Sequence, residues 1–162
     1  MRELFTFGRY LRGKYDQKIY KVPVSIPGFT CPNIDGSVAV GGCSFCENES
    51  FSPNLTVKPK SKFSLKQNST QNPMLEFQLL SLESQFFKTS TKLQKKFKAK
   101  SFLVYFQSFS NTYAPYETLE ALYQKALSLP NVTGLSIGTR SDCIDDRVLE
   151  FLAEQSKERE IW

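Results

Sequence analysis

Apolar and polar residues alternate near the start of the chain and predict a first strand over residues 19–26. Tyr20, Val22, Val24 and Ile26 fall on one face of an extended backbone, whereas the residues between them are mostly polar. Pro23 interrupts the polar face and has no backbone N–H to donate to a neighbouring strand. We therefore expect this strand to be irregular or to lie at the edge of a sheet.

The apolar spacing changes to a helical period over residues 73–97. Pro73 suits the first turn of a helix. The apolar stripe of this helix recurs at spacings of three, four or seven and consists of Leu75, Leu79, Leu82, Phe86, Leu93 and Phe97. The continuous apolar run 102–106 follows it, which is typical of a strand that is buried on both faces in a parallel sheet.

A second and a third β–α unit complete the pattern. Pro115 opens a helix that ends at Leu129-Pro130, and its predicted buried face is Leu119, Leu122, Tyr123, Ala126 and Leu127. Residues 132–137 predict the next strand. Alternating strands and helices predict an α/β fold with parallel strands and right-handed crossovers.

The last predicted helix follows the turn 138–143. Asp142 is the candidate N-cap, and Asp145 and Asp146 suit the first turn of the helix, where negative charge is favourable. The expected apolar side of this helix is Ile144, Val148, Leu149 and Leu152. A fourth strand is expected to begin at residues 160–162.

Composition is near that of globular proteins, with 40% hydrophobic and 23% charged residues among 162. The chain has no His, which excludes Ser–His and Cys–His dyads and every His-containing zinc site. We find neither a signal peptide nor an apolar run of roughly 18 residues that could span a membrane. These features predict a cytoplasmic protein that does not interact with membranes.

The net charge of +5 is unevenly distributed. Residues 1–100 contain 16 Lys and Arg against 7 Asp and Glu, a net charge of +9, and residues 101–162 contain 5 against 9, a net charge of −4. The Lys-rich stretch 88–100 could contact RNA. A solvated, Lys-rich helix end explains it better, because no recognised RNA-binding module accompanies it.

A long segment, residues 27–72, separates the first strand from the first long helix and contains three of the four cysteines. We interpret residues 31–51 as functional and residues 53–72 as largely mobile. Cys31, Cys43 and Cys46 have the spacing C-x11-C-x2-C. The glycines among them allow tight turns, and binding sites of parallel α/β folds form at the C-terminal ends of strands.

Three kinds of chemistry are compatible with these cysteines. A structural zinc site needs four ligands, so that Cys143 or a carboxylate would have to join Cys31, Cys43 and Cys46. A disulfide is less compatible with a reducing cytosol. A [4Fe–4S] cluster held by three thiolates leaves one iron open for a substrate or a cofactor.

Four short motifs carry a family resemblance. The segment G-F-T-C-P-N-x-D-G with G-G-C-x-F-C, and later Y-F-Q-x-F-S-N-T-Y-A-P and G-T-R-S-D-C, resemble an uncharacterised bacterial family of radical S-adenosylmethionine (SAM) proteins. That family is similar to the group that includes the catalytic subunit of Elongator. The resemblance extends from about residue 9 to residue 162 and is most specific around the cysteines.

The resemblance implies that Cys31, Cys43 and Cys46 hold a [4Fe–4S] cluster whose open iron binds SAM. Reductive cleavage of SAM would give a 5′-deoxyadenosyl radical that acts on an unknown substrate, with an electron donor such as flavodoxin or ferredoxin. Phe45 matches the position of an aromatic residue near the adenine. The region of the family that contacts the methionine amino group corresponds to Ser108, Ser110 and Asn111, although a GGE-type motif is missing there. A tRNA partner is a weaker implication.

The family fold is a partial (β/α)6 barrel, and residues 1–162 would supply its N-terminal half. The pattern contains about three βα units and then stops at the fourth strand. We therefore expect a truncated core domain with an incomplete SAM site. The leading alternative is a zinc-stabilised, non-catalytic binding module, with RNA as a possible partner.

Further residues have competing interpretations. Cys143 could be a second functional thiol, but a buried or free cysteine is the better expectation. Arg140 could hold a carboxylate at the site or form a structural salt bridge. Tyr105, Phe106 and Phe109 could stack on a cofactor, and core packing is the better expectation for Phe106.

Overall fold

The structure is a computed structural model that describes residues 4–44, 46 and 71–162. These residues form a parallel four-stranded sheet with the strand order β1-β2-β3-β4. The strands are β1 (Ile19–Val24), β2 (Ser101–Phe106), β3 (Val132–Ile137) and β4 (Glu160–Ile161). The α/β prediction is confirmed, and so is the fourth strand, because β4 pairs in parallel with β3.

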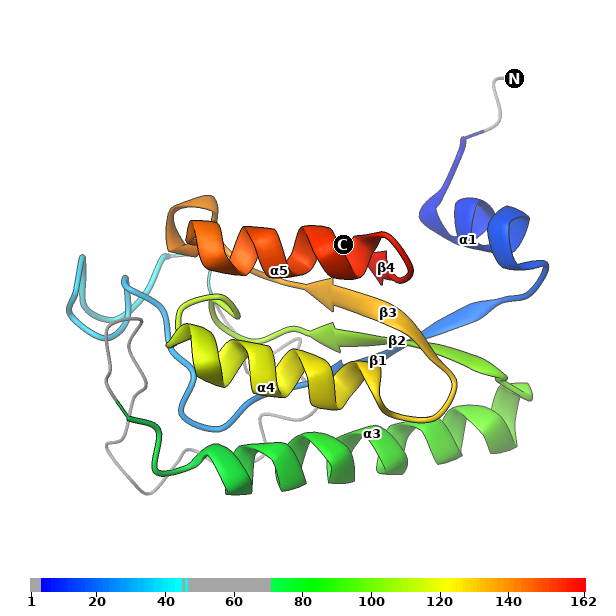
Figure 1. The fold of residues 1–162 in the computed structure, drawn as a ribbon, viewed down its shortest axis with the longest axis horizontal. Helices are drawn as coiled ribbons and strands as arrows, with labels where there is room; N and C mark the ends of the chain where they lie inside the picture. Colours follow the sequence, from blue (N-terminus) through cyan, green and yellow to red (C-terminus); the bar gives the residue numbers. More distant parts are fainter. Residues whose placement is uncertain (1–3, 45, 47–70) are drawn as a thin grey trace.

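Helices connect successive strands. Besides α1 (Phe7–Tyr15), the structure contains α3 (Leu75–Phe97), α4 (Tyr116–Leu127), the short 3-10 helix η1 (Ser141–Cys143) and α5 (Asp146–Ser156). Because the strands are parallel and in sequential order, right-handed crossovers place α3, α4 and α5 on one face of the sheet (Figure 1). No helix among the described residues is both long and apolar enough to cross a membrane.

The hydrophobic core lies between the sheet and these three helices. Val22, Val104 and Phe106 of the sheet and Leu82 and Leu122 of the helices are completely inaccessible to solvent. The predicted buried face of α4 is confirmed in full, and Leu82 and Phe86 are the buried members of the predicted α3 stripe. Phe97, the last member of that stripe, is 48% exposed, and its ring stacks on that of Tyr20 in the edge strand β1.

Three further predictions can be compared with the structure. The edge position expected from Pro23 is confirmed, because β1 pairs only with β2 among the described strands. The prediction of Asp142 as N-cap is wrong: Asp142 lies in η1, and Asp145 caps α5 by accepting a 2.9 Å hydrogen bond from the N–H of Val148. Leu149 is exposed, and Phe151 packs against the core from α5 instead.

A buried carboxylate connects the two ends of the described structure. Glu160 is only 4% exposed, and its Oε1 accepts hydrogen bonds from Lys14 Nζ and, at 2.9 Å, from Tyr15 Oη. Its Oε2 accepts a 2.9 Å hydrogen bond from Trp162 Nε1. Burial raises the pKa of Glu160, but the three donors together outweigh it, so the pKa is held below the usual glutamate value.

We expect Glu160→Gln to lower the free energy of unfolding by about 1–3 kcal/mol at neutral pH, because an ionised acceptor is lost in a buried site. The lowered pKa means that the stabilisation is present above the unfolded value of 4.5 and is lost as the pH falls through the folded value. Urea unfolding near pH 7 and near pH 3 should therefore show that acid lowers the free energy of unfolding less in the variant than in the wild type. This expectation would be contradicted if acid lowered the free energy of unfolding equally in the wild type and in Glu160→Gln. It would also be contradicted if Glu150→Gln, on the exposed side of α5, lowered the free energy of unfolding as much as Glu160→Gln does.

A cysteine loop at the C-terminal edge of the sheet

Two glutamines of α3 fix the segment that leads from β1 to the cysteines. The carboxamide of Gln85 forms a pair of 2.9 Å hydrogen bonds with the backbone N–H and C=O of Ser25. Gln78 is completely buried, and its Nε2 donates to the C=O of Pro27 at 2.7 Å. Because backbone groups buried away from water need partners, these side chains hold the irregular chain in a single course. Cys31 therefore starts from a well-fixed position at the C-terminal edge of the sheet.

The loop from Cys31 to Gly42 is tightly folded by its own backbone. The C=O of Cys31 accepts hydrogen bonds from the N–H groups of Ile34 and Asp35, and the C=O of Asn33 accepts one from Gly42 at 2.8 Å. Gly42 has a φ of 89°, which is a conformation that side chains disfavour, and a Cβ there would lie 3.4 Å from Ile34. The loop lies where the strand arrows point in Figure 1, at the edge where sites of parallel sheets form.

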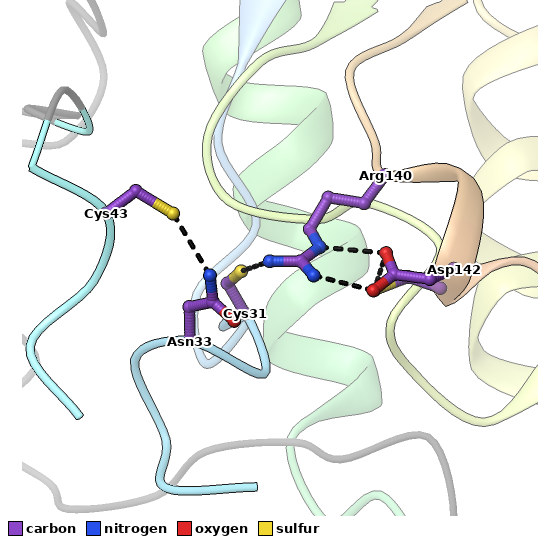
Figure 2. A network of polar contacts seen from close by, with 6 residues as sticks. Cys31, Asn33, Cys43, Arg140 and Asp142 are labelled. Atoms are coloured by element: carbon purple, nitrogen blue, oxygen red, sulfur yellow. Dashed lines mark hydrogen bonds and ion pairs between the residues drawn. The ribbon is translucent and has the colours of Figure 1, made fainter. Parts of the chain in front are cut away.

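Two of the cysteine sulfurs each have a nitrogen donor nearby, as Figure 2 shows. Asn33 Nδ2 lies 3.0 Å from Cys43 Sγ. Arg140 Nη1, from the segment after β3, lies 3.8 Å from Cys31 Sγ. Both cysteines are half-buried. The structure thus brings a residue 109 positions away in the sequence to the cysteine loop.

The guanidinium of Arg140 is held by a second, bidentate interaction. Its Nε and Nη2 donate to the two carboxylate oxygens of Asp142 at 2.8 and 2.6 Å. Hydrogen bonding to Arg140 lowers the pKa of Asp142 to about 2, and the same hydrogen bonds raise the pKa of Arg140. Both groups are therefore ionised at neutral pH. Of the two interpretations of Arg140, the salt bridge is present, and it leaves one further donor facing Cys31.

The residues after β2 line the same edge from inside. Ser108, Ser110 and Asn111 are buried, and the N–H of Ser110 donates to the C=O of Thr30, the residue before Cys31, at 3.2 Å. Asn111 Nδ2 donates to the C=O of Gly138 at 2.8 Å. Its Oδ1 is buried and has no hydrogen-bond partner among the described residues. A buried acceptor without a donor is costly, so this atom calls for a partner such as a water, an ion or a ligand.

Cys143 lies at the same edge, next to the Arg140–Asp142 pair. It is buried in η1, and its C=O accepts a 2.7 Å hydrogen bond from the hydroxyl of Thr112. Its Sγ lies 3.7 Å from Asp142 Oδ1, and burial raises the pKa of its thiol. The expectation of a buried cysteine is confirmed.

The aromatic candidates separate into different environments. Phe106 is completely buried and packs edge-on against Tyr123, so core packing is confirmed for it. Tyr105 lies on the opposite face of β2, where Lys21 Nζ lies 4.7 Å from its ring centroid. Phe109 packs against the core with a φ of 65°, a left-handed conformation that a phenylalanine rarely adopts.

The three cysteines do not form a ready-made metal site. Within the described residues, no group of three or more Cys, Asp or Glu side chains is placed to hold a metal ion. Cys46 is exposed, and Phe45, the predicted aromatic neighbour of adenine, lies outside the described residues. A centre held by Cys31, Cys43 and Cys46 therefore requires their sulfur atoms to come closer than they lie here. The thiol donor set and the orphaned Asn111 Oδ1 nevertheless fit a soft metal centre beside a polar ligand.

Sequence reasoning did not find Asn33 or the Arg140–Asp142 pair as partners of the cysteines. Asn33 lies inside the quoted motif, so its position was visible, but the direction of its side chain was not. Asp142 precedes an apolar helix, which is why the sequence pattern predicts a helix cap there. A long-range contact such as Arg140 to Cys31 leaves no periodic signal in the sequence.

Comparison with known proteins finds relatives in bacteria and an archaeon. The chain is 34% identical over 160 residues to the uncharacterized protein YtqA of Bacillus subtilis, covering 97% of this chain and 42% of YtqA. It is 33% identical over 157 residues to protein YhcC of Escherichia coli K12, covering 96% of this chain and 43% of YhcC. The uncharacterized protein MJ0486 of Methanocaldococcus jannaschii is 38% identical over 148 residues, which is 91% of this chain and 38% of MJ0486.

The chain thus spans about two fifths of the length of the curated relatives that it matches. No protein-family profile matches the chain, and no solved structure matches it. Alignment of nearly all of this chain with a part of each relative shows that the relatives share this region.

Proposed function

We propose that this chain is the cluster-binding part of a radical SAM protein, in which Cys31, Cys43 and Cys46 hold a [4Fe–4S] cluster. The observation that carries the proposal is the placement of the C-x11-C-x2-C loop directly after β1, at the C-terminal edge of a parallel sheet. The sequential strand order with helices on one face is also what the first half of a (β/α)6 barrel requires. The substrate of such a protein stays open.

The residues of this edge have separate tasks in the proposal. The three thiolates would hold the cluster, and the glycine turns would let the loop wrap around it. Asn111 Oδ1, a buried acceptor without a partner among the described residues, would accept a hydrogen bond from the amino group of SAM, beside Ser108 and Ser110. After reduction by an external one-electron donor, a bound cluster would supply the electron that cleaves a sulfonium C–S bond of SAM into methionine and a 5′-deoxyadenosyl radical.

Anaerobic reconstitution with iron and sulfide tests the proposal directly. We expect about four irons per chain, with a broad visible absorption band, in the wild-type protein. The triple variant in which Cys31, Cys43 and Cys46 are alanine should lose this iron. Cys143→Ala is the matched control, because it removes the fourth thiol of the chain and should keep the iron.

The same experiment identifies the zinc alternative. A four-thiolate zinc site would need Cys143 as its last ligand, so Cys143→Ala would then release the metal together with the other cysteines. Folded wild-type protein that binds one zinc, takes up no iron and remains colourless would overturn the radical SAM proposal. Iron uptake that survives the triple substitution would overturn the assignment of the three ligands.

A further inference from the structure

Two side chains present N–H groups to the sulfur atoms of the cysteine loop, one for each of two cysteines. Asn33 Nδ2 is 3.0 Å from Cys43 Sγ, and Arg140 Nη1 is 3.8 Å from Cys31 Sγ. The two donors come from different parts of the chain, the loop itself and the segment after β3 (Figure 2). In these contacts, each of the two sulfur atoms has its own donor.

The guanidinium of Arg140 and the backbone of Asn33 are held by contacts that do not involve the cysteine sulfurs, whereas Asn33 Oδ1 is buried without a hydrogen-bond partner among the described residues. The backbone C=O of Asn33 accepts a hydrogen bond from the N–H of Gly42 at 2.8 Å, which fixes the turn that carries the side chain. Arg140 uses Nε and Nη2 for the carboxylate of Asp142, which orients the planar guanidinium and leaves Nη1 directed at Cys31. An Arg that served only as the partner of Asp142 would not need this third contact.

We propose that Asn33 and Arg140 are positioning residues that donate N–H···S hydrogen bonds to the Cys43 and Cys31 thiolates and thereby raise the reduction potential of a cluster held there. The inference rests on the proposed function, because it presupposes thiolate ligation by these two cysteines. Hydrogen bonds to the cysteine sulfurs are among the factors that set the potentials of iron–sulfur clusters.

The sign of the effect follows from charge. Reduction by one electron adds negative charge to the cluster and its thiolates. A nearby N–H dipole or guanidinium stabilises the more negative, reduced form more than the oxidised form. Removing either donor should therefore make reduction harder and lower the potential. Asp142 partly neutralises Arg140, so that we expect a moderate effect rather than that of an isolated charge.

The test is a mediated redox titration of the reconstituted protein, followed by the spectrum of the cluster. At the midpoint potential of the wild type, Arg140→Gln should lower the ratio of reduced to oxidised cluster about tenfold, which corresponds to ~59 mV for a one-electron couple. Asn33→Asp replaces the donor with a carboxylate of the same shape and should lower the ratio at least as much. If Asn33→Asp loses its iron, Asn33→Leu removes the donor without adding charge and is measured in its place.

The control is Arg147→Gln, which removes the same charge from an exposed ion pair with Glu117. In Arg147→Gln, the ratio of reduced to oxidised cluster should stay within twofold of the wild-type ratio. Equal potentials in the wild type, Arg140→Gln and the Asn33 variant, all with the same iron content, would overturn this inference and leave the proposed function intact. Failure of the wild-type protein to assemble any cluster would instead overturn the proposed function, and the inference with it.

Discussion

Replacing Gly134 by alanine is expected to detach β4 from β3 and to lower the free energy of unfolding by about 3 kcal/mol. A Cβ at Gly134 would lie 1.9 Å from the backbone oxygen of Glu160 and 2.7 Å from its nitrogen, distances that no side chain can occupy. Because backbone atoms cannot move aside as a flexible side chain can, β4 would have to move away. The hydrogen bonds of Glu160 to Lys14 and Tyr15 would be lost with it.

Trp162 reports this change, because it is the only tryptophan of the chain. Its ring packs edge-on against Phe7 and Tyr10, and its backbone N–H donates to the C=O of Leu135 at 3.0 Å. Detachment of β4 should expose the ring and shift its fluorescence emission to longer wavelength. Gly13→Ala in α1 is the matched control, since nothing lies within 4 Å of its new methyl group and alanine favours the helix. An unchanged emission spectrum and unfolding curve for Gly134→Ala would contradict the tight β3–β4 contact.

Sequence periodicity was sufficient for the central elements of the fold. The run 102–106 could be recognised as a buried strand because almost every residue in it is apolar, and β2 is one of the two described strands, with β3, that have neighbours on both sides. The face of α4 was correct in each residue because that helix is covered by the sheet and by neighbouring helices. Periodicity works where one burial environment extends along the whole element.

The errors occur where a short or tertiary contact decides the structure. The sequence pattern predicts no element at helix α1, whose two glycines lower its helix propensity, and Thr6 caps this helix by accepting a 3.3 Å hydrogen bond from the N–H of Arg9. Asp142 has the position of a helix cap, but Arg140 binds its carboxylate, and Asp145 takes the capping role. Leu149 fits the helical stripe of α5, yet it lies beyond the part that the core covers.

In the candidate site, too, some features could be predicted from the sequence, whereas others depend on tertiary contacts. The cysteine spacing could be recognised from the sequence, and the position of the loop followed from its place after a strand. The orphaned Oδ1 of Asn111 and the donors of Asn33 and Arg140 could not be predicted, because they depend on side-chain directions set by contacts between β2, β3 and the loop. Each of these residues lies in an irregular segment that follows a strand, where the periodic pattern has stopped.

The edge of the sheet that carries the cysteine loop depends on one aromatic contact in the core. Phe106 ends β2 and is completely buried, with its ring centroid 5.2 Å from that of Tyr123. Tyr123 in turn donates a 2.6 Å hydrogen bond from its hydroxyl to the C=O of Asn111. The packing of Phe106 therefore supports the backbone of the segment that presents Asn111 to the site.

Phe106→Ala is expected to lower the free energy of unfolding by about 3–5 kcal/mol, because the removed ring leaves a cavity that a packed sheet cannot close. Urea unfolding followed by circular dichroism measures this cost. Phe77→Ala removes the same ring from an outward position on α3, where the side chain is 58% exposed, and should cost less than about 1 kcal/mol. Equal costs for the two variants would mean that β2 and α4 do not form the rigid support of this edge.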